Sequence, residues 1–119
     1  MKIEKASIIR AAGNKPKVIE EFIGRVNTET DEISLARMKS PGGWIEPGQT
    51  PEFNEYTLVL KGVLRVKTKA DVIDVHEGEA CIARAGTWVQ YSTPHPEGAE
   101  YIAVCCPGYS PGLVHRESK

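Results

Sequence analysis

Short β-prone stretches recur along most of this chain at intervals of about 8 to 12 residues, and Gly or Pro separates them. The stretches that we expect to form strands are 33–38, 56–60, 63–68, 72–75, 80–83, 87–91 and 100–105. Apolar and basic residues alternate in 63–68, so this stretch and 56–60 read as a hairpin with one face in water. Residues 18–23 are too few for periodicity to separate a helical turn from a strand. The pattern favours an all-β fold, as an antiparallel sandwich or barrel.

Composition limits the function classes. A chain of 119 residues holds one core, and its 15 basic and 16 acidic residues are interleaved, so we expect no nucleic-acid-binding face. No apolar run approaches the roughly 20 residues that span a bilayer, so we expect no membrane partner. The mixed charges at the start do not resemble a signal peptide, so we expect a cytoplasmic protein.

The three cysteines give neither an even disulfide framework nor a C-x-x-C pair. We expect Cys81, Cys105 and Cys106 to be reduced structural thiols. Thiol redox chemistry at the adjacent pair remains an alternative, although neighbouring residues of a strand point to opposite faces and disfavour a disulfide between them.

Two sets of spaced residues carry a resemblance to a known family. Glu55 is followed by six residues and then Gly62, and seven residues separate Gly78 from Gly86. These spacings are similar to the two motifs of the cupin superfamily. The resemblance spans residues 32–106 and implies a double-stranded β-helix, or jelly-roll, barrel. We therefore expect an N-terminal extension over 1–31 that packs on the barrel or on a partner, and a C-terminal tail over 107–119.

The resemblance also marks the positions at which cupins hold a metal ion. Gln49, Pro51 and Val89 stand where the motif has histidines, whereas Glu55 keeps the glutamate of the motif. A transition-metal site of this kind needs imidazole nitrogens beside the carboxylate. We therefore expect no metal and no cofactor.

The three histidines of the chain lie in turns or in the tail, at positions 76, 95 and 115. The simplest interpretation is that they are solvated. In the alternative, the loop of His95 or the tail folds over the barrel mouth and brings an imidazole to Glu55.

Strand parity predicts which side chains face the barrel interior. The resemblance implies that Gln49, Glu55 and Val89 face the interior, and parity from these positions adds Phe53 and Tyr91. Trp44 follows Gly42-Gly43 in a loop that we expect near the barrel mouth. The expected ligand contacts are Trp44, Gln49, Phe53 and Val89. We expect Glu55 and Tyr91 to be catalytic, because burial raises the pKa of a carboxyl group into the range useful for acid or base catalysis and Tyr91 supplies a hydrogen-bond donor. The alternative is a structural Glu55, paired with Arg37, Lys39 or Arg84.

These residues favour a barrel that binds a small polar or organic metabolite, acting as a metal-independent isomerase, lyase or epimerase through Glu55. A non-catalytic binding or sensing module is one alternative, and a metal-dependent oxygenase with unusual ligands is another. Because cupins commonly pair and a chain this short leaves sheet edges uncovered, we expect a homodimer.

Overall fold

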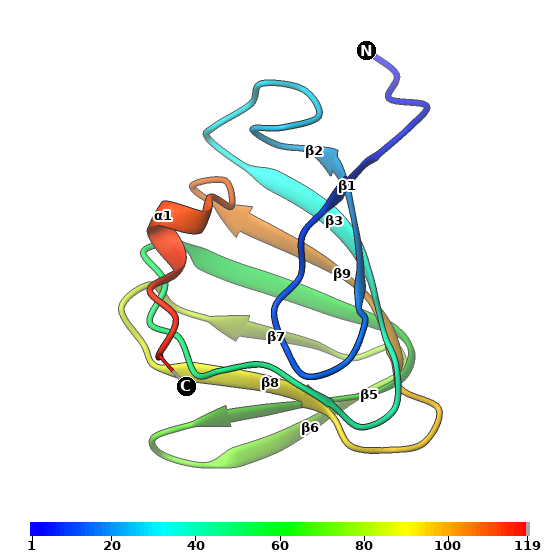
Figure 1. The fold of residues 1–119 in the computed structure, drawn as a ribbon, viewed down its shortest axis with the longest axis vertical. Helices are drawn as coiled ribbons and strands as arrows, with labels where there is room; N and C mark the ends of the chain where they lie inside the picture. The colour runs from blue at the N-terminus through cyan, green and yellow to red at the C-terminus, as the bar shows by residue number, and fades with distance from the viewer. Residues whose placement is uncertain (119) are drawn as a thin grey trace.

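The computed structural model describes residues 1–118, which form an antiparallel sheet that curls around a common interior (Figure 1). The strands are β1 (Ser7–Ile9), β2 (Val18–Ile23), β3 (Ser34–Ser40), β4 (Trp44–Ile45), β5 (Asn54–Thr68), β6 (Val72–His76), β7 (Ala80–Ala83), β8 (Val89–Thr93) and β9 (Ala99–Cys106). One short helix, α1 (Pro111–Val114), follows in the described part of the chain. The all-β prediction is confirmed.

The 15-residue strand β5 joins the two halves of the sheet. Its first part pairs with β7 and β9, and its second part pairs with β6 and β8. The sequence predicted a hairpin here, which is wrong, because the chain bends at Gly62 without reversing. Gly62 has a φ of 76° and follows a register shift between Val59 and Lys61. A side chain at Gly62 would collide with the carbonyl oxygen of Gly98, so only glycine lets the two strands approach here.

The N-terminal segment extends the sheet at one edge. The ambiguous stretch 18–23 is strand β2, which pairs with β1 on one side and β3 on the other. The loop between β1 and β2 then crosses to β4, where the Trp44 indole Nε1 donates to the Ala12 carbonyl oxygen at 3.0 Å. This contact anchors the loop against the barrel.

The C-terminal tail returns along residues 48–52. The Glu52 amide donates to the Leu113 carbonyl at 2.9 Å, and the Glu117 amide donates to the Gly48 carbonyl at 2.8 Å. The Trp88 indole faces outward and donates to Glu117 at 2.9 Å. Lys119, the last residue of the predicted tail, lies outside the described residues.

Two groups of buried side chains fill most of the interior. The larger one comprises Trp44, Val59, Leu64, Val66, Val75, Val89, Tyr91, Ala99 and Tyr101. The smaller one comprises Phe53, Cys105 and Val114, with Tyr109 and Leu113 packed against it. Among residues 1–118, no helix is both long and apolar enough to cross a membrane.

Candidate functional site

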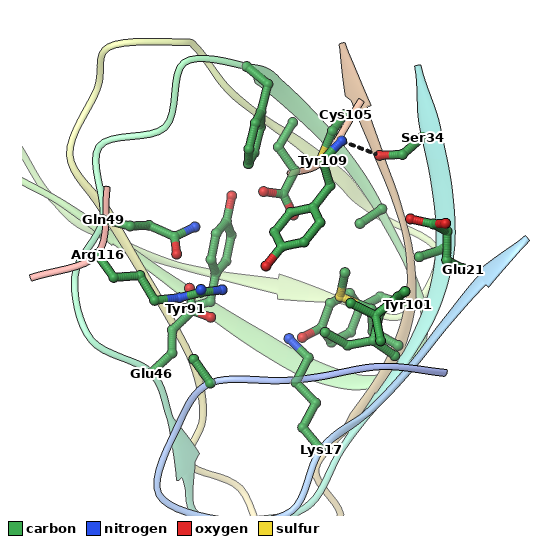
Figure 2. A pocket seen from close by; sticks show the side chains of 18 residues that line it. Lys17, Glu21, Ser34, Glu46, Gln49, Tyr91, Tyr101, Cys105, Tyr109 and Arg116 are labelled. Atoms are coloured by element: carbon green, nitrogen blue, oxygen red, sulfur yellow. Dashed lines mark hydrogen bonds between the residues drawn. The ribbon is translucent and has the colours of Figure 1, made fainter. Parts of the chain in front are cut away.

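A cavity of about 50 Å³ lies inside the barrel and touches both buried groups. Strands β1, β2, β3, β5, β8 and β9 supply its walls, and the segment between β4 and β5, the loop between β1 and β2 and the C-terminal tail complete them. Figure 2 shows Lys17, Glu46, Tyr91 and Arg116 directed toward this space. Apolar and aromatic walls with a few polar groups are typical of sites for small organic ligands.

Glu55 is held in the middle of the sheet, because its backbone pairs with Cys105 of β9 and Ala83 of β7. Its side chain lines the cavity, as parity predicts from the buried neighbours Thr57 and Val59. The exposed side chains of Tyr56, Leu58 and Leu60 alternate with them on the outer face of β5. The sheet thus fixes the carboxyl group inside the barrel.

Burial raises the pKa of Glu55 to about 7, and the nearby Glu46 carboxylate adds to this effect. Lys17, Arg116 and Tyr91 act in the opposite direction, but their combined effect is smaller. Near pH 7 the carboxyl group therefore populates both its protonated and its ionised form, which is the condition that favours acid–base catalysis.

The structural alternative for Glu55 required a cationic partner on a neighbouring strand. Arg37 instead binds Glu20, with 2.8 Å between Nε and Oε1, and Lys39 and Arg84 are exposed. Within residues 1–118, none of the three forms a salt bridge with Glu55.

Glu46 brings a second carboxyl group to the cavity. Its side chain is 6% exposed, and its Oε2 atom has no hydrogen-bond partner in the described chain. Burial raises its pKa, and the charges of Lys17 and Arg116 oppose that increase.

Lys17 stays charged despite its enclosure. Burial lowers its pKa, but Tyr101, Glu46 and Glu55 together outweigh burial, so that the net shift is upward. The Lys17 ammonium nitrogen lies 4.0 Å from the centre of the Trp44 ring and 5.3 Å from that of Tyr101. These cation–π contacts hold the ammonium group in place.

The six predicted site residues fall into two groups. Gln49, Phe53, Glu55 and Tyr91 line the cavity, and the Gln49 Oε1 atom and the Tyr91 hydroxyl have no partner in residues 1–118. Burial, reinforced by the charge of Glu55, raises the pKa of Tyr91 well above its usual value, so this phenol is neutral.

Trp44 and Val89 lie in the packed core, each 1% exposed, and do not line the cavity. Trp44 carries the Lys17 ammonium group on its ring, and so acts on the cavity through that residue. The backbone of Val89 pairs with that of Gln49 through two hydrogen bonds of 3.0 and 2.8 Å, and so positions the Gln49 side chain.

Sequence reasoning missed Lys17, Glu46 and Arg116. Lys17 and Arg116 lie outside the stretch that carries the two motifs, and Glu46 stands in a Pro-Gly turn. Nothing in the local spacing of Lys17 or Arg116 marks them, because tertiary contacts of the terminal segments bring these two residues to the barrel.

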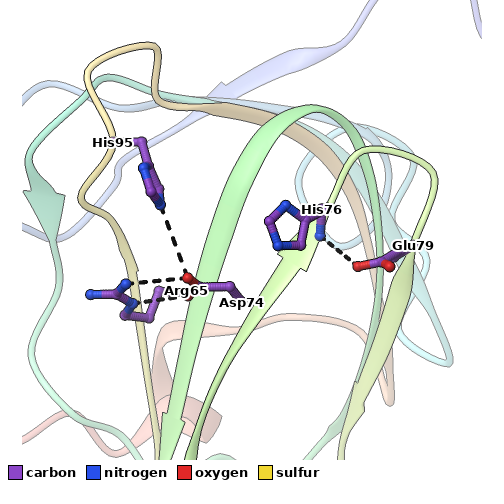
Figure 3. Close-up of polar contacts among 5 residues, drawn as sticks. All are labelled: Arg65, Asp74, His76, Glu79 and His95. Carbon is purple, nitrogen blue, oxygen red and sulfur yellow. Dashed lines mark hydrogen bonds and ion pairs between the residues drawn. The ribbon is translucent and has the colours of Figure 1, made fainter.

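The donor set does not fit the metal ion that this kind of barrel commonly holds. His95 Nε2 lies 4.0 Å from the carboxylate of Asp74, which also binds Arg65. His76 lies on the same strand as Asp74, β6 (Figure 3). His115 pairs with Glu52 rather than with Glu55. No histidine lines the cavity, and residues 1–118 contain no group of three or more His, Cys, Asp or Glu able to hold a metal ion.

The cysteines are free in the described structure. Burial raises the pKa of Cys81 to about 11 and also raises that of Cys105, which keeps both thiols protonated and weakly nucleophilic. Cys105 is buried and Cys106 is exposed, as expected for neighbours on a strand. The arrangement offers no support for redox chemistry at this pair.

Comparison with known proteins gives one partial sequence relative and several solved structures of the same fold. No family model matches the chain. A protein named Endoribonuclease YbeY from Myxococcus xanthus (strain DK1622) is 39% identical over 102 residues, which are 86% of this chain and 35% of that protein. The chain thus spans about a third of the length of this curated relative.

Solved structures agree on the architecture. The polyketide cyclase RemF from Streptomyces resistomycificus matches with a TM-score of 0.79 at 16% identity, over 100% of this chain and 86% of the other. The oxalate decarboxylase of Bacillus subtilis matches with a TM-score of 0.78 at 17% identity, over 98% of this chain and 31% of the other. A predicted oxalate decarboxylase from Thermotoga maritima matches with a TM-score of 0.75 at 16% identity, over 90% of this chain and 99% of the other. These barrels confirm the cupin, or jelly-roll, fold and, at such low identity, show the fold alone.

Proposed function

We propose that the barrel binds a small polar metabolite in its cavity and catalyses a metal-independent proton transfer, as an isomerase, epimerase or lyase. The observation that carries this proposal is Glu55, a carboxyl group inside the cavity with a pKa of about 7 and no salt bridge in residues 1–118. Such a group accepts a proton and returns it without a large free-energy cost at neutral pH.

In the proposed step, the ionised Glu55 removes a proton from a substrate carbon next to a carbonyl group. The electron pair of that C–H bond moves onto the carbonyl oxygen and forms an enolate. Tyr91, whose hydroxyl is buried without a partner, donates a hydrogen bond to this oxygen. In an isomerisation of a hydroxycarbonyl substrate, the hydroxyl group of the enediolate loses its proton, Glu55 delivers its proton to the former carbonyl carbon, and the carbonyl forms at the neighbouring carbon. In a lyase reaction, the carbonyl reforms as a group leaves the adjacent carbon with its bonding electron pair.

The size of the cavity limits the substrate. A water molecule needs about 10 to 15 Å³ of such space, and an engineered cavity of about 150 Å³ holds benzene. A cavity of about 50 Å³ therefore takes a ligand of about three to five non-hydrogen atoms. An RNA strand is far larger, so we do not assign the ribonuclease activity named for the Myxococcus protein to this cavity.

A non-catalytic binding module is the second candidate. The similarity to the Myxococcus protein favours it, because the match covers 35% of that protein and leaves most of its length for a separate activity. In this candidate, the same cavity binds the metabolite without changing it.

Deuterium exchange in D₂O distinguishes the two candidates. We expect the protein to exchange carbon-bound hydrogens of small hydroxy and oxo compounds, as followed by proton NMR, and Glu55→Gln to abolish the exchange. Glu77→Gln, at an exposed turn, is the matched control. Exchange that persists in Glu55→Gln would contradict the proposed role, whereas binding without exchange would favour the binding module. Treatment with a chelator is expected to leave the rate unchanged.

We further infer that the protein acts in the cytoplasm as a homodimer. Its free cysteines suit a reducing compartment. Tyr56, Leu58, Leu60 and Ile82 are at least 37% exposed on the outer faces of β5 and β7, where a second copy would cover them.

A further inference from the structure

The two terminal segments each bring one cation into the cavity. Lys17 stands just before β2, and Arg116 lies beyond α1. Figure 2 shows both side chains directed toward the cavity. Arg116 is positioned by a backbone bridge to Gln49, and Lys17 is positioned by the rings of Trp44 and Tyr101. Both cations are therefore held at fixed places rather than extended into solvent.

Neither cation is paired with a carboxylate inside the described chain. The salt bridges of residues 1–118 include neither Lys17 nor Arg116, and the buried Nε of Arg116 has no hydrogen-bond acceptor. Glu46 and Glu55 line the same cavity and interact with both cations through their charges, but neither forms a salt bridge with them in residues 1–118. The third carboxylate at the cavity wall, Glu21, accepts from the amides of Val26 and Asn27 at 3.0 and 2.9 Å. A buried cation that forms no salt bridge gains free energy when an anion binds directly to it, so the two cations together suit an anionic ligand.

Unpartnered acceptors accompany these cations. Glu46 and Gln49 are 6% and 4% exposed, and each has one side-chain oxygen without a donor. Within residues 1–118, the cavity therefore leaves its two cations without a salt-bridge acceptor and these two oxygens without a hydroxyl or amine donor. One small molecule that carries a carboxylate and a hydroxyl group supplies both.

We propose that the ligand of this cavity is a two-carbon hydroxy acid, with its carboxylate bound by Lys17 and Arg116 and its hydroxyl group donating to Glu46 or Gln49. The inference rests on the proposed function and names the substrate class of the same site. It also gives the cations a role in the proton transfer, since the charge that leaves the C–H bond develops on the carboxylate that they bind.

Three probes separate the parts of this inference. Glycolate carries both groups, acetate lacks the hydroxyl group, and glycolamide lacks the charge. We expect calorimetry to show that glycolate binds at least about tenfold more tightly than either of the other two, as the loss of one buried polar interaction would give. Equal affinity for glycolate and glycolamide, or no binding of glycolate, would overturn the inference.

Variants assign the contacts. Arg116→Gln and Lys17→Gln are expected to weaken glycolate binding at least about tenfold, while Arg84→Gln, at an exposed arginine outside the cavity, leaves it unchanged. Glu46→Gln should reduce the preference for glycolate over acetate. If Arg116→Gln does not fold, Arg116→Lys tests the same contact. Wild-type affinity in both cation variants would refute the assignment.

The same samples separate this inference from the proposed function. Glycolate binding without exchange of its carbon-bound hydrogens in D₂O would uphold the ligand class and refute catalysis. Exchange of a neutral carbonyl compound without glycolate binding would do the reverse.

Discussion

Replacement of Glu55 by Gln tests the buried carboxyl group through stability, without knowledge of the substrate. The folded protein holds the Glu55 proton with a pKa of about 7, against 4.5 for an ordinary glutamate. In the unfolded chain the Glu55 carboxyl group ionises above pH 4.5, whereas in the folded protein it stays protonated up to about pH 7. The free energy of unfolding therefore falls as the pH rises from 4.5 to about 7. Glutamine has the same shape and does not titrate.

The expected magnitude follows from the two pKa values. At about 1.4 kcal/mol for each pKa unit, the difference between 4.5 and about 7 corresponds to about 3 kcal/mol. We expect Glu55→Gln to gain about this much stability relative to the wild type between pH 4.5 and pH 8. Urea unfolding at a series of pH values measures it, and Glu77→Gln controls for the loss of a surface carboxylate. A stability difference that does not change with pH would refute the reasoning.

Three other substitutions test separate parts of the structure. Tyr91→Phe removes a hydroxyl without a partner, so urea unfolding should change by less than about 1 kcal/mol while the exchange rate falls about 100-fold; a large loss of stability would contradict this. Trp44→Ala empties a site that is 1% exposed and should cost about 3 to 5 kcal/mol in the same assay, whereas a cost below about 1 kcal/mol would show that the ring is not packed. Leu58→Glu, at a side chain that is 44% exposed, should convert a dimer into a folded monomer in analytical ultracentrifugation; a monomeric wild type would contradict the homodimer.

Local alternation predicts the strands of an all-β fold, and the resemblance to the cupin motifs places Glu55 inside the barrel. Inward and outward residues alternate along β5 as the period of two requires, so Thr57 is buried where Leu58 is exposed. Parity also brings Gln49 and Phe53 to the cavity, in agreement with the structure. These features depend on near neighbours in the sequence, which is why they can be predicted.

The remainder of the site depends on contacts between distant parts of the chain. Arg116 reaches the cavity because its backbone pairs with that of Gln49, and no local pattern encodes this pairing. Lys17 is placed by the ring of Trp44, which itself lies in the core rather than at the cavity wall. The continuous strand through Gly62 could not be predicted for a related reason. A glycine between two β-prone stretches is compatible both with a hairpin turn and with a bend at which two backbones approach closely.

The most direct test of the account is a carbon-13 NMR titration of the Glu55 side-chain carboxyl group in chelator-treated protein, with the resonance assigned by its loss in Glu55→Gln. The account predicts a midpoint near pH 7. A midpoint at or below the ordinary glutamate value of 4.5 would contradict it.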